Sequence, residues 1–574
     1  MLSRRTAFFA LIAALVTAAV YLPALGNGFV DWDDYVYLYE SEGLRLTGLQ
    51  FLKWAFTSIV HSNWHPLTII TYGVEYELWG FDPFGYHLVN VLLHAANTFL
   101  VFVLASQLFV LAFQKSSDAH LLREKAVLAG AFMAAIVFGL HPQHVESVAW
   151  VSELKDVLSA FFFLLSVLLY IRYAKGEGRR AYFYALSFIS FSLALLSKPM
   201  AITLPIALLI LDFYPLGRAH GLMGLKKAVI EKLPFLALIP VVALVTVWAQ
   251  GGDRAIAPLM VSPISERIDI AIRGFAFYLK KLFFPADLVP FYVRPLAGEF
   301  YNPGFFLSLF ALSSIGAASV VLRRRALSAA YLYYLITLLP VIGLVQVSDM
   351  AAADRYSYLP SLGPVLFLSG VAALFVSRSH RRLVLLAAVF IPAALVMAFL
   401  TVKQIYVWKD SVSLWTQQIK VYPTMIQAYA KRAKAYEKAG IFDKAAEDYT
   451  GIINKAPADL QLLLLKRAEV YVKAGNNRMA IRDYDLVIGL DERNGAAYSG
   501  KGAVLFQVGD LSGAISSFQK VLEIRPGNPA ALFNLGIAYS TAGESEKGIE
   551  LIREAARLGL PAASDYLGSD VPTP

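Results

Sequence analysis

The sequence contains no cysteine, and this absence excludes several kinds of chemistry. Without thiols the chain can form no disulfide, no thiolate metal site and no cysteine nucleophile. Charged residues are also scarce, at 16% of 574 residues, whereas hydrophobic residues make up 57%. A chain this long and this apolar exceeds what a single soluble core accommodates. The composition therefore indicates a membrane protein.

A glycine fingerprint for binding dinucleotides or nucleotide sugars is missing as well. Lys and Arg exceed Asp and Glu by nine, but residues 424–574 hold 18 of each sign. The whole excess therefore lies in residues 1–423, with 33 basic and 24 acidic residues, among apolar runs. A basic balance can indicate nucleic-acid binding, but here it belongs to membrane loops. We expect no nucleic-acid partner.

Apolar runs succeed one another up to about Leu400. Runs of roughly 17–25 residues are long enough to cross a bilayer. We predict about eleven spans, some of them short, near Thr6–Leu25, His87–Phe113, Ala126–Leu140, Val157–Tyr173, Ala181–Leu196, Met200–Phe213, Leu233–Trp248, Gly304–Leu322, Ser328–Val345, Tyr358–Val376 and Leu383–Val402.

Basic residues orient this predicted bundle, because positively charged loops stay in the cytoplasm. Arg4 and Arg5 precede the first span, and basic loops then alternate with acidic ones. We therefore predict a cytoplasmic N-terminus and a C-terminal tail on the outer face of a multi-pass protein. The first span is read as an uncleaved anchor; a cleaved signal peptide is the alternative, but Pro23–Gly26 offers no small-x-small cleavage site.

The tail is a repeat array. Glycines recur at 440, 475, 509 and 543, a spacing of 35, 34 and 34 residues, with alanines and aromatics at matching offsets. This period is typical of the tetratricopeptide (TPR) repeat, two antiparallel helices joined by a glycine turn. About four repeats predict a short solenoid whose groove binds an acceptor protein or peptide. A folding or spacing module without a ligand is the alternative.

Three carboxylates, Asp31, Asp33 and Asp34, follow the first predicted span. One carboxylate suffices as the general base that deprotonates an incoming hydroxyl. A second would orient the acceptor or hold a divalent cation through oxygen ligands. The alternative is a helix N-cap, which requires only one Asp.

Further ionic residues lie near other predicted outer-face boundaries. Lys155, Lys198 and Arg355 are candidates for binding the phosphate of a lipid-linked donor. The alternatives are a Lys155–Asp156 ion pair, snorkelling of Lys198 to water, and an Arg355–Asp354 pair. The residues assigned to acceptor or sugar contact are His65, His141, His144 and Asp354. His141 and His144 have the spacing of metal ligands on a helix, but no third ligand is evident.

Carboxylates and phosphate-seeking cations on one membrane face suit a transfer reaction. We expect a polyprenyl-phosphate-linked sugar as donor and a hydroxyl as acceptor, with the cations stabilising the departing phosphate.

At these residues the chain resembles the transmembrane and TPR-containing O-mannosyltransferase family, in particular its bacterial-type members. The segments that carry the resemblance are Asp31–Asp34, Trp64–Thr68, Tyr86–His94, His141–Trp150, Lys198–Met200, Asp354–Tyr356 and the trailing repeats. The resemblance implies a GT-C glycosyltransferase fold with its active site on the periplasmic or lumenal face. It implies acceptor activation by Asp33 and Asp34. The chain departs from the family's usual residues at His65 and at Leu154–Asp156, so the resemblance does not identify the sugar.

We therefore predict an all-α protein. Residues 1–402 would form a membrane glycosyltransferase domain, 403–423 a connector with a partial TPR helix, and 424–570 the TPR domain. The enzyme would be inverting and would use an undecaprenyl or dolichyl carrier, in the case of a bacterium at the inner membrane. The alternatives are a non-catalytic TPR scaffold, a transporter of lipid-linked sugars, and an enzyme that modifies an envelope glycolipid.

Overall fold

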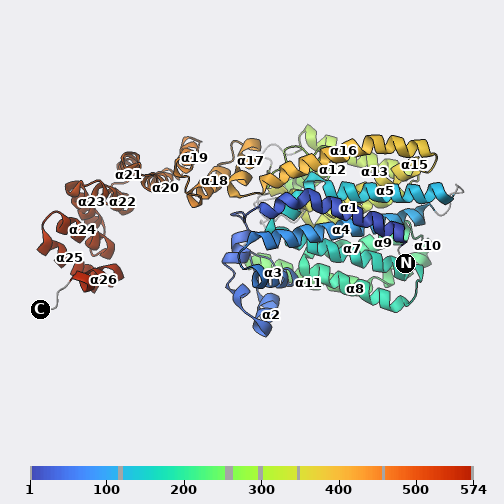
Figure 1. The fold of residues 1–574 in the computed structure, drawn as a ribbon, viewed down its shortest axis with the longest axis horizontal. Coiled ribbons are helices and arrows are strands. Elements are labelled where there is room, and N and C mark those ends of the chain that lie inside the picture. Colours follow the sequence, from blue (N-terminus) through green and yellow to red (C-terminus); the bar gives the residue numbers. More distant parts are fainter. Residues whose placement is uncertain are drawn as a thin grey trace. The chain divides into compact units, whose positions relative to one another are not determined.

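The computed structural model describes residues 3–113, 120–252, 263–294, 301–344, 350–455 and 459–570. The chain divides into two compact units, Met1–Leu414 and Trp415–Pro574. Regular structure in the described residues is almost entirely helical (Figure 1), so the all-α prediction is confirmed. The unit boundary falls within the predicted connector, inside helix α17 (Ser411–Val421).

The first unit is a bundle of long helices lying side by side (Figure 1). Its longer helices are α1 (Arg4–Tyr21), α4 (Pro83–Ala112), α5 (His120–Leu140), α7 (Leu154–Lys175), α8 (Arg180–Ser197), α11 (Leu233–Gly252), α12 (Ile264–Phe283), α13 (Pro303–Val321), α14 (Arg325–Leu338), α15 (Leu362–Val376) and α16 (His380–Val407). Its shorter helices are α2 (Gly48–Thr57), α3 (Pro66–Trp79), α6 (Val145–Ala149), α9 (Leu204–Phe213) and α10 (Gly221–Ile230). Two short strands, β1 (Tyr292–Val293) and β2 (Met350–Ala352), pair antiparallel.

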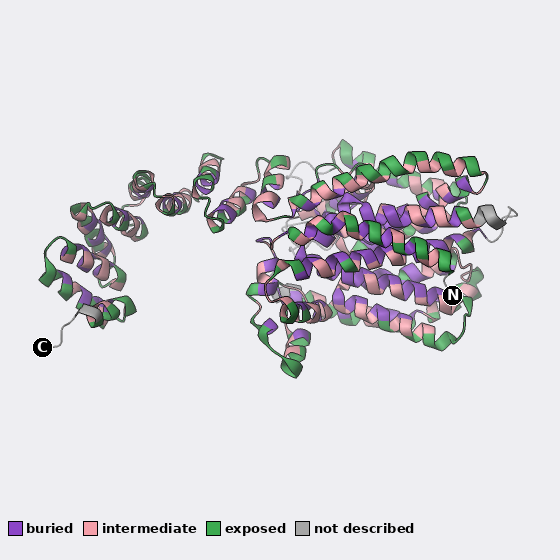
Figure 2. Ribbon diagram, in the orientation of Figure 1, coloured by how far each residue is buried: buried purple, intermediate pink, exposed green. Residues whose placement is uncertain are grey.

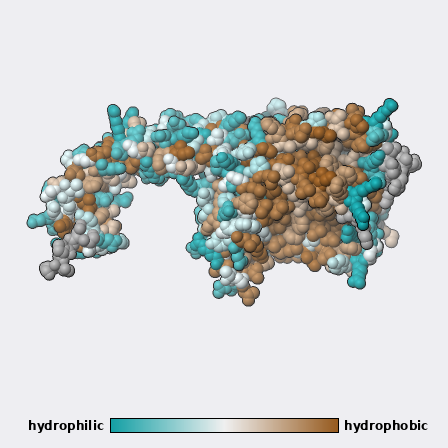
Figure 3. All heavy atoms as spheres, viewed as in Figure 1, coloured by the Kyte–Doolittle hydropathy of each residue, from teal (hydrophilic) through white to brown (hydrophobic). Residues whose placement is uncertain are grey.

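Six of the described helical segments are long and apolar enough to cross a membrane, judged by length and composition. Two bent pairs, α5 with α6 and α10 with α11, raise the number to eight. Three shorter apolar helical segments complete the set: Pro199–Phe213, Arg325–Val341 and Leu362–Val376. Each of the eleven predicted runs overlaps one of these helical segments, although Ile342–Leu344 and Tyr358–Ser361 lie outside them and Val345 lies outside the described residues. Figure 3 shows hydrophobic side chains over the middle of the bundle.

Helix α7 lies at the centre of the bundle. In its apolar segment 78% of residues are buried, against none in that of α16, which faces outward (Figure 2). Just before α7 the chain breaks: α5 and α6 are bent by 49° around Pro142, whose ring removes a backbone donor. The polar residues at the start of α7 are therefore buried at one end of the bundle.

The second unit consists of helix pairs. These are α18 (Ile426–Lys438) with α19 (Phe442–Lys455), α20 (Leu460–Lys473) with α21 (Asn477–Leu490), α22 (Gly495–Gln507) with α23 (Leu511–Ile524), and α24 (Pro529–Thr541) with α25 (Ser545–Arg557), followed by α26 (Pro561–Asp570). Gly440, Gly475, Gly509 and Gly543 each have positive φ in the turn within a pair. Glycine adopts this conformation at no steric cost, which explains why a glycine recurs at this turn in each repeat.

Candidate active site

The Asp34 side chain ties the first loop of the bundle to the start of α7. It is 1% exposed, and one carboxylate oxygen accepts the Val30 N–H at 2.9 Å. The other oxygen accepts the Ser152 N–H at 2.9 Å and the Ser152 hydroxyl. The side chain makes no N-cap hydrogen bond to the following π-helical turn Tyr35–Tyr39, so the N-cap alternative is wrong for Asp34. Burial raises the pKa of the Asp34 carboxyl to about 7.

Asp33 faces a tight turn instead. Val60 and Asn63 exchange both backbone hydrogen bonds at 3.0 Å, and His61 and Ser62 between them have φ of 49° and 58°. Positive φ at both central residues is the geometry of a two-residue hairpin turn. The turn places His61 Nε2 3.4 Å from the Asp33 carboxylate. Because His61 is half exposed, Asp33 lies where the buried site meets the surface.

Asp31 is also buried, and its backbone N–H donates to the Ser411 hydroxyl at 2.7 Å. The Gly28 N–H similarly donates to the Lys409 carbonyl at 2.8 Å. These two bonds attach the first loop to the segment that follows α16. All three predicted carboxylates are therefore buried.

Three cations surround the buried carboxylate of Glu153. Lys155 and Arg355 approach one of its oxygens, each at 3.3 Å, and Lys198 approaches the other at 3.1 Å. Lys198 also pairs with Asp156, and Arg355 with Glu146. The structure thus brings together the three predicted phosphate-binding residues, which come from three distant segments. We call this set, Lys155, Lys198 and Arg355 around Glu153, the cation cluster.

The pairings suggested by adjacency in the sequence are wrong. Lys155 pairs with Glu153, which precedes the first residue of α7, rather than with Asp156, its neighbour on the helix, whose side chain points in a different direction. Arg355 turns to Glu146 and Glu153, whereas Asp354 accepts a hydrogen bond from the Tyr292 hydroxyl at 3.0 Å. Lys198 does not snorkel, since its side chain is only 13% exposed.

Aromatic rings connect the first loop to the cation cluster. The Trp150 ring lies between Trp32 and Trp408, with both ring centroids 5.2 Å away. Lys155 and Arg355 lie over Trp150 at 5.9 and 5.4 Å, and Lys155 lies 5.2 Å from the Tyr37 ring centroid. Since Ser152 holds Asp34 and immediately precedes Glu153, the first-loop carboxylates and the cation cluster share one end of the bundle.

Two buried polar atoms beside the cluster have no hydrogen-bond partner within the described chain: His65 Nδ1 and Trp150 Nε1. His65 is 5% exposed, and burial together with the charges of Lys155 and Lys198 lowers its pKa well below the usual value. The imidazole is therefore neutral at physiological pH. Buried polar atoms usually have partners, so these two are candidates for contact with a bound ligand.

His141 and His144 are engaged with protein groups. His141 contacts the Leu282 carbonyl at 3.0 Å. His144 contacts the Phe138 carbonyl at 2.8 Å and the Ser361 hydroxyl at 3.1 Å, so both of its ring nitrogens are occupied. Sugar contact by His144 would require breaking one of these bonds. Among the described residues, no group of three or more His, Asp or Glu side chains is arranged to hold a metal ion.

No role was assigned from the sequence to Glu146, Ser152 and Glu153, which belong to this site. Glu146 lies in the segment His141–Trp150, and Ser152 and Glu153 lie just before Lys155. The partners of Glu146 and Ser152 are 209 and 118 residues away in the sequence. His61 was also missed, since its contact depends on a positive φ. The available signal was Glu153 itself, a carboxylate at the start of an apolar run, which requires a cation.

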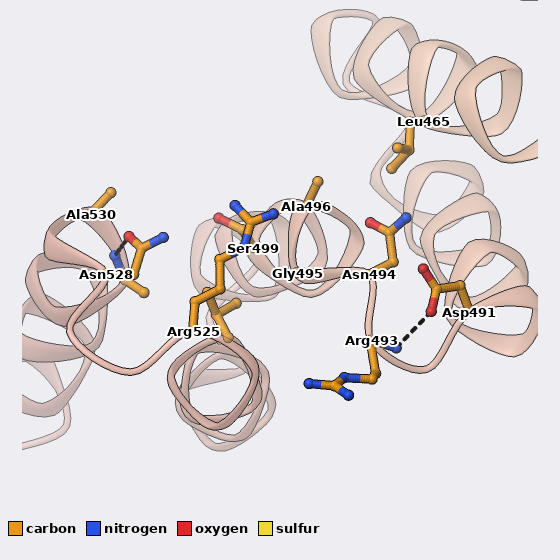
Figure 4. Close-up of a pocket in the computed structure, with 12 residues that line it drawn as sticks. Leu465, Asp491, Arg493, Asn494, Gly495, Ala496, Ser499, Arg525, Asn528 and Ala530 are labelled. Atoms are coloured by element: carbon orange, nitrogen blue, oxygen red, sulfur yellow. Dashed lines mark hydrogen bonds between the residues drawn. The ribbon is translucent and has the colours of Figure 1, made fainter.

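The second unit has a pocket of about 470 Å³ between α22, α23 and α24 (Figure 4). Arg493, Arg525 and Ser499 line it with polar groups. Asp491 accepts the backbone N–H of Arg493 at 3.0 Å, and Asn528 accepts that of Ala531 at 3.0 Å. Two arginines on neighbouring repeats give this pocket a basic character.

Comparison with known proteins finds a TPR repeat and similarity to protein O-mannosyl-transferases. A TPR repeat family model matches residues 502–543. Protein O-mannosyl-transferase TMTC4 of Mus musculus is 32% identical over 29% of this chain and 23% of its own length. Protein O-mannosyl-transferase TMTC2 of Mus musculus is 36% identical over 21% and 13%, and Tmtc2 of Drosophila melanogaster 31% over 38% and 22%. The predicted family assignment is supported.

These matches span less than a quarter of the length of each TMTC relative. Among solved structures, MamA is 18% identical with a TM-score of 0.24, covering 28% of this chain and 90% of its own. YrrB, described as a TPR protein with an unusual peptide-binding site, is 19% identical with a TM-score of 0.25, covering 28% and 82%.

Proposed function

We propose that this protein is a membrane glycosyltransferase that moves a sugar from a polyprenyl-phosphate carrier to a hydroxyl of an acceptor protein. The observation that carries the proposal is the gathering of Asp33, Asp34 and the cation cluster at one end of the apolar bundle. The names of the TMTC relatives, protein O-mannosyl-transferases, support the same chemistry.

Asp33 is the proposed general base. Both oxygens of Asp34 are occupied by Val30 and Ser152, and its raised pKa keeps it partly protonated near neutral pH. The Asp33 carboxylate instead lies 3.4 Å from Nε2 of the half-exposed His61, at the surface side of the site. Asp34 is therefore assigned a positioning role, and Asp33 the proton transfer.

In the proposed step the acceptor oxygen attacks the anomeric carbon from the side opposite the phosphate. The carbon–phosphate-oxygen bond breaks, its electron pair stays on the phosphate, and Asp33 takes the acceptor proton. The anomeric configuration inverts, and the products are the glycosylated protein and the free carrier phosphate.

Lys155, Lys198 and Arg355 would stabilise the charge that develops on the departing phosphate. Glu153 holds all three cations in place before the donor arrives, and such preorganised charge is usually the largest contribution to catalysis. His65 Nδ1 and Trp150 Nε1 would supply hydrogen bonds to the sugar or the phosphate. His141, His144 and Asp354 would then position the surrounding protein segments through their hydrogen bonds, without contacting the sugar.

The TPR unit would recruit the acceptor. The pocket between α22, α23 and α24 carries Arg493 and Arg525, which suits an extended acceptor segment with acidic residues. By the distribution of basic loops, the site and the TPR unit would both face the periplasm or the exterior.

The test uses the purified full-length protein with a panel of polyprenyl-phosphate sugars and a Ser/Thr-rich acceptor protein. Mass spectrometry follows two products, the free carrier lipid and the glycosylated acceptor. Sugar-dependent appearance of both products supports the proposal. Carrier release with sugar on a glycolipid instead would identify a different acceptor, and release with none of the donors would refute the proposal.

A further inference from the structure

A second cavity lies far from the carboxylates and the cation cluster. Its volume is about 860 Å³, and α4, α7, α9, α14 and α15 line it. On α7 its lining begins at Phe163 and extends to Val167, whereas Lys155 lies at the start of the helix. At 1.5 Å per residue, Phe163 is about 12 Å and Val167 about 18 Å along the axis from Lys155. The cavity therefore begins in the middle of the bundle and extends toward its other end.

The cavity is an elongated apolar groove. Along α15 it is lined from Leu362 to Phe375, a distance of about 20 Å. Gly363 and Gly370 are part of this stripe, and the missing side chains leave room there; a Cβ on Gly370 would already lie 3.1 Å from the Phe109 ring. Apart from a cluster at one end, its lining is almost entirely aliphatic and aromatic. A groove of this length and composition fits a hydrocarbon chain.

Four arginines gather at one end of the groove. Arg323 and Arg324 come from the turn between α13 and α14, Arg325 is the first residue of α14, and Arg378 follows the end of α15. The described residues that line the groove include no carboxylate, and within the described part of the chain none of these arginines forms an ion pair with an acid. All four are exposed. This end of the groove therefore has a strong, uncompensated positive charge.

The start of α14 adds backbone donors at the same place. The helix begins at Arg325, and its N-cap residue Arg324 makes no side-chain capping bond. The first N–H groups of a helix have no partner within it, and helix N-termini accordingly bind phosphates. Ala326 and Leu327 of this first turn line the groove. Backbone donors and guanidinium groups thus surround the same opening.

We propose that this groove binds an anionic phospholipid of the surrounding bilayer. One acyl chain occupies the apolar stripe along α15, and the phosphate is held by Arg323, Arg324, Arg325 and Arg378 at the first turn of α14. Charge complementarity selects the headgroup, since basic pockets between membrane helices favour anionic lipids. The site lies at the opposite end of the bundle from the proposed transfer chemistry and does not depend on it.

The experiment is native mass spectrometry of the purified full-length protein in detergent, titrated with phosphatidylglycerol or phosphatidylcholine. We expect one phosphatidylglycerol to be retained and phosphatidylcholine to bind at least tenfold more weakly. Arg378→Gln should weaken phosphatidylglycerol binding about fivefold, and the triple change Arg323→Gln, Arg324→Gln and Arg325→Gln about a hundredfold. The matched control is Arg381→Gln, a nearby arginine outside the groove, which should leave binding unchanged.

A second variant tests the acyl-chain part separately. Ala326→Trp fills the mouth of the groove without changing its charge and should abolish retention of the lipid, while thermal unfolding verifies that the variant is folded. Equal binding of both lipids, or equal binding by the wild type, the triple variant and Ala326→Trp, would overturn the proposal. So would selective retention of an added polyprenyl phosphate over phosphatidylglycerol, because the occupant would then be the carrier lipid.

Discussion

At the scale of single residues, the two adjacent carboxylates Asp33 and Asp34 have different surroundings and therefore different proposed roles. Asp34 accepts three hydrogen bonds in a buried place, whereas Asp33 is next to the half-exposed His61. Neighbouring side chains in the sequence thus separate into a structural group and a reactive group. The same change from Asp to Asn at each of the two positions should distinguish the two roles.

Asp34→Asn should destabilise the protein. An amide presents one N–H2 group where a carboxylate presents an acceptor, so at least one of the Val30 and Ser152 donors loses its partner. Leaving a buried donor unsatisfied costs about 1–3 kcal/mol. Thermal unfolding in detergent measures the change, and Asp33→Asn is the control, with an expected loss of at most about 1 kcal/mol. Equal losses in the two variants would contradict the assignment.

The stability of the wild type should also depend on pH through Asp34. Its pKa is raised from 3.8 to about 7, so between these values the folded protein holds a proton that the unfolded chain releases. The contribution of Asp34 to the free energy of unfolding is therefore fully present below pH 4 and falls as the pH rises to 7. Asp34→Asn cannot titrate, and its unfolding temperature should fall less over this range. An identical pH profile in both proteins would refute the raised pKa.

Glu153 should be more important for stability than any surface carboxylate. Glu153→Gln keeps the shape of the side chain but removes the charge that Lys155, Lys198 and Arg355 share. Breaking a buried ion pair costs about 3–5 kcal/mol. Glu124→Gln is the control, because its pair with Arg5 is exposed and should contribute about 0–1 kcal/mol. A Glu153 variant as stable as the Glu124 variant would show that the cations do not depend on this anion.

At the scale of elements, close contact between α5 and α15 depends on a glycine. A Cβ on Gly130 would lie 2.7 Å from the Ala373 Cβ and 2.9 Å from the Ser369 carbonyl. Gly130→Ala should therefore force the helices apart and cost about 1–3 kcal/mol. Gly26→Ala is the matched control, since nothing lies within 4 Å of its Cβ position. Thermal unfolding of the two variants compares them, and equal stability would contradict the close packing.

The elements themselves were largely predictable from the sequence. Each apolar run became a helix because length and hydropathy depend on local residues alone, and the turn glycines 440, 475, 509 and 543 marked the repeats. The ion pairs were not predictable. Arg355 and Glu146 are 209 residues apart in the sequence, and only the folded bundle decides that Arg355 turns away from Asp354. The His61–Asp33 contact likewise requires positive φ at His61 and Ser62, which neither residue type predicts.

At the scale of the whole molecule, the second unit has its own core. Three hydrophobic clusters, around Tyr484, Phe518 and Ile552, are built only from residues of that unit. Ion pairs at repeat spacing, Arg432 with Asp448 and Arg467 with Asp483, each 2.7 Å, join the two helices of a repeat. The unit satisfies its own packing in the manner of a repeat protein.

Residues 415–574 should therefore fold when they are expressed alone. We expect a helical circular dichroism spectrum and a cooperative thermal transition, because stacking of neighbouring repeats buries their apolar faces. Asp483→Asn should lower the midpoint temperature of this transition, because the largely buried Arg467 would lose its charged partner. A disordered spectrum for the isolated unit would show that its stability depends on the bundle.

The central claim is that Asp33 activates the acceptor hydroxyl beside the cation cluster. The most direct test is single-turnover release of free carrier lipid from a bound polyprenyl-phosphate sugar, compared between the wild type and Asp33→Asn. We expect a 10²- to 10⁴-fold slower release in the variant, as for the loss of a general base, with unchanged donor binding and unfolding temperature. Release at the wild-type rate by the Asp33 variant would contradict the account.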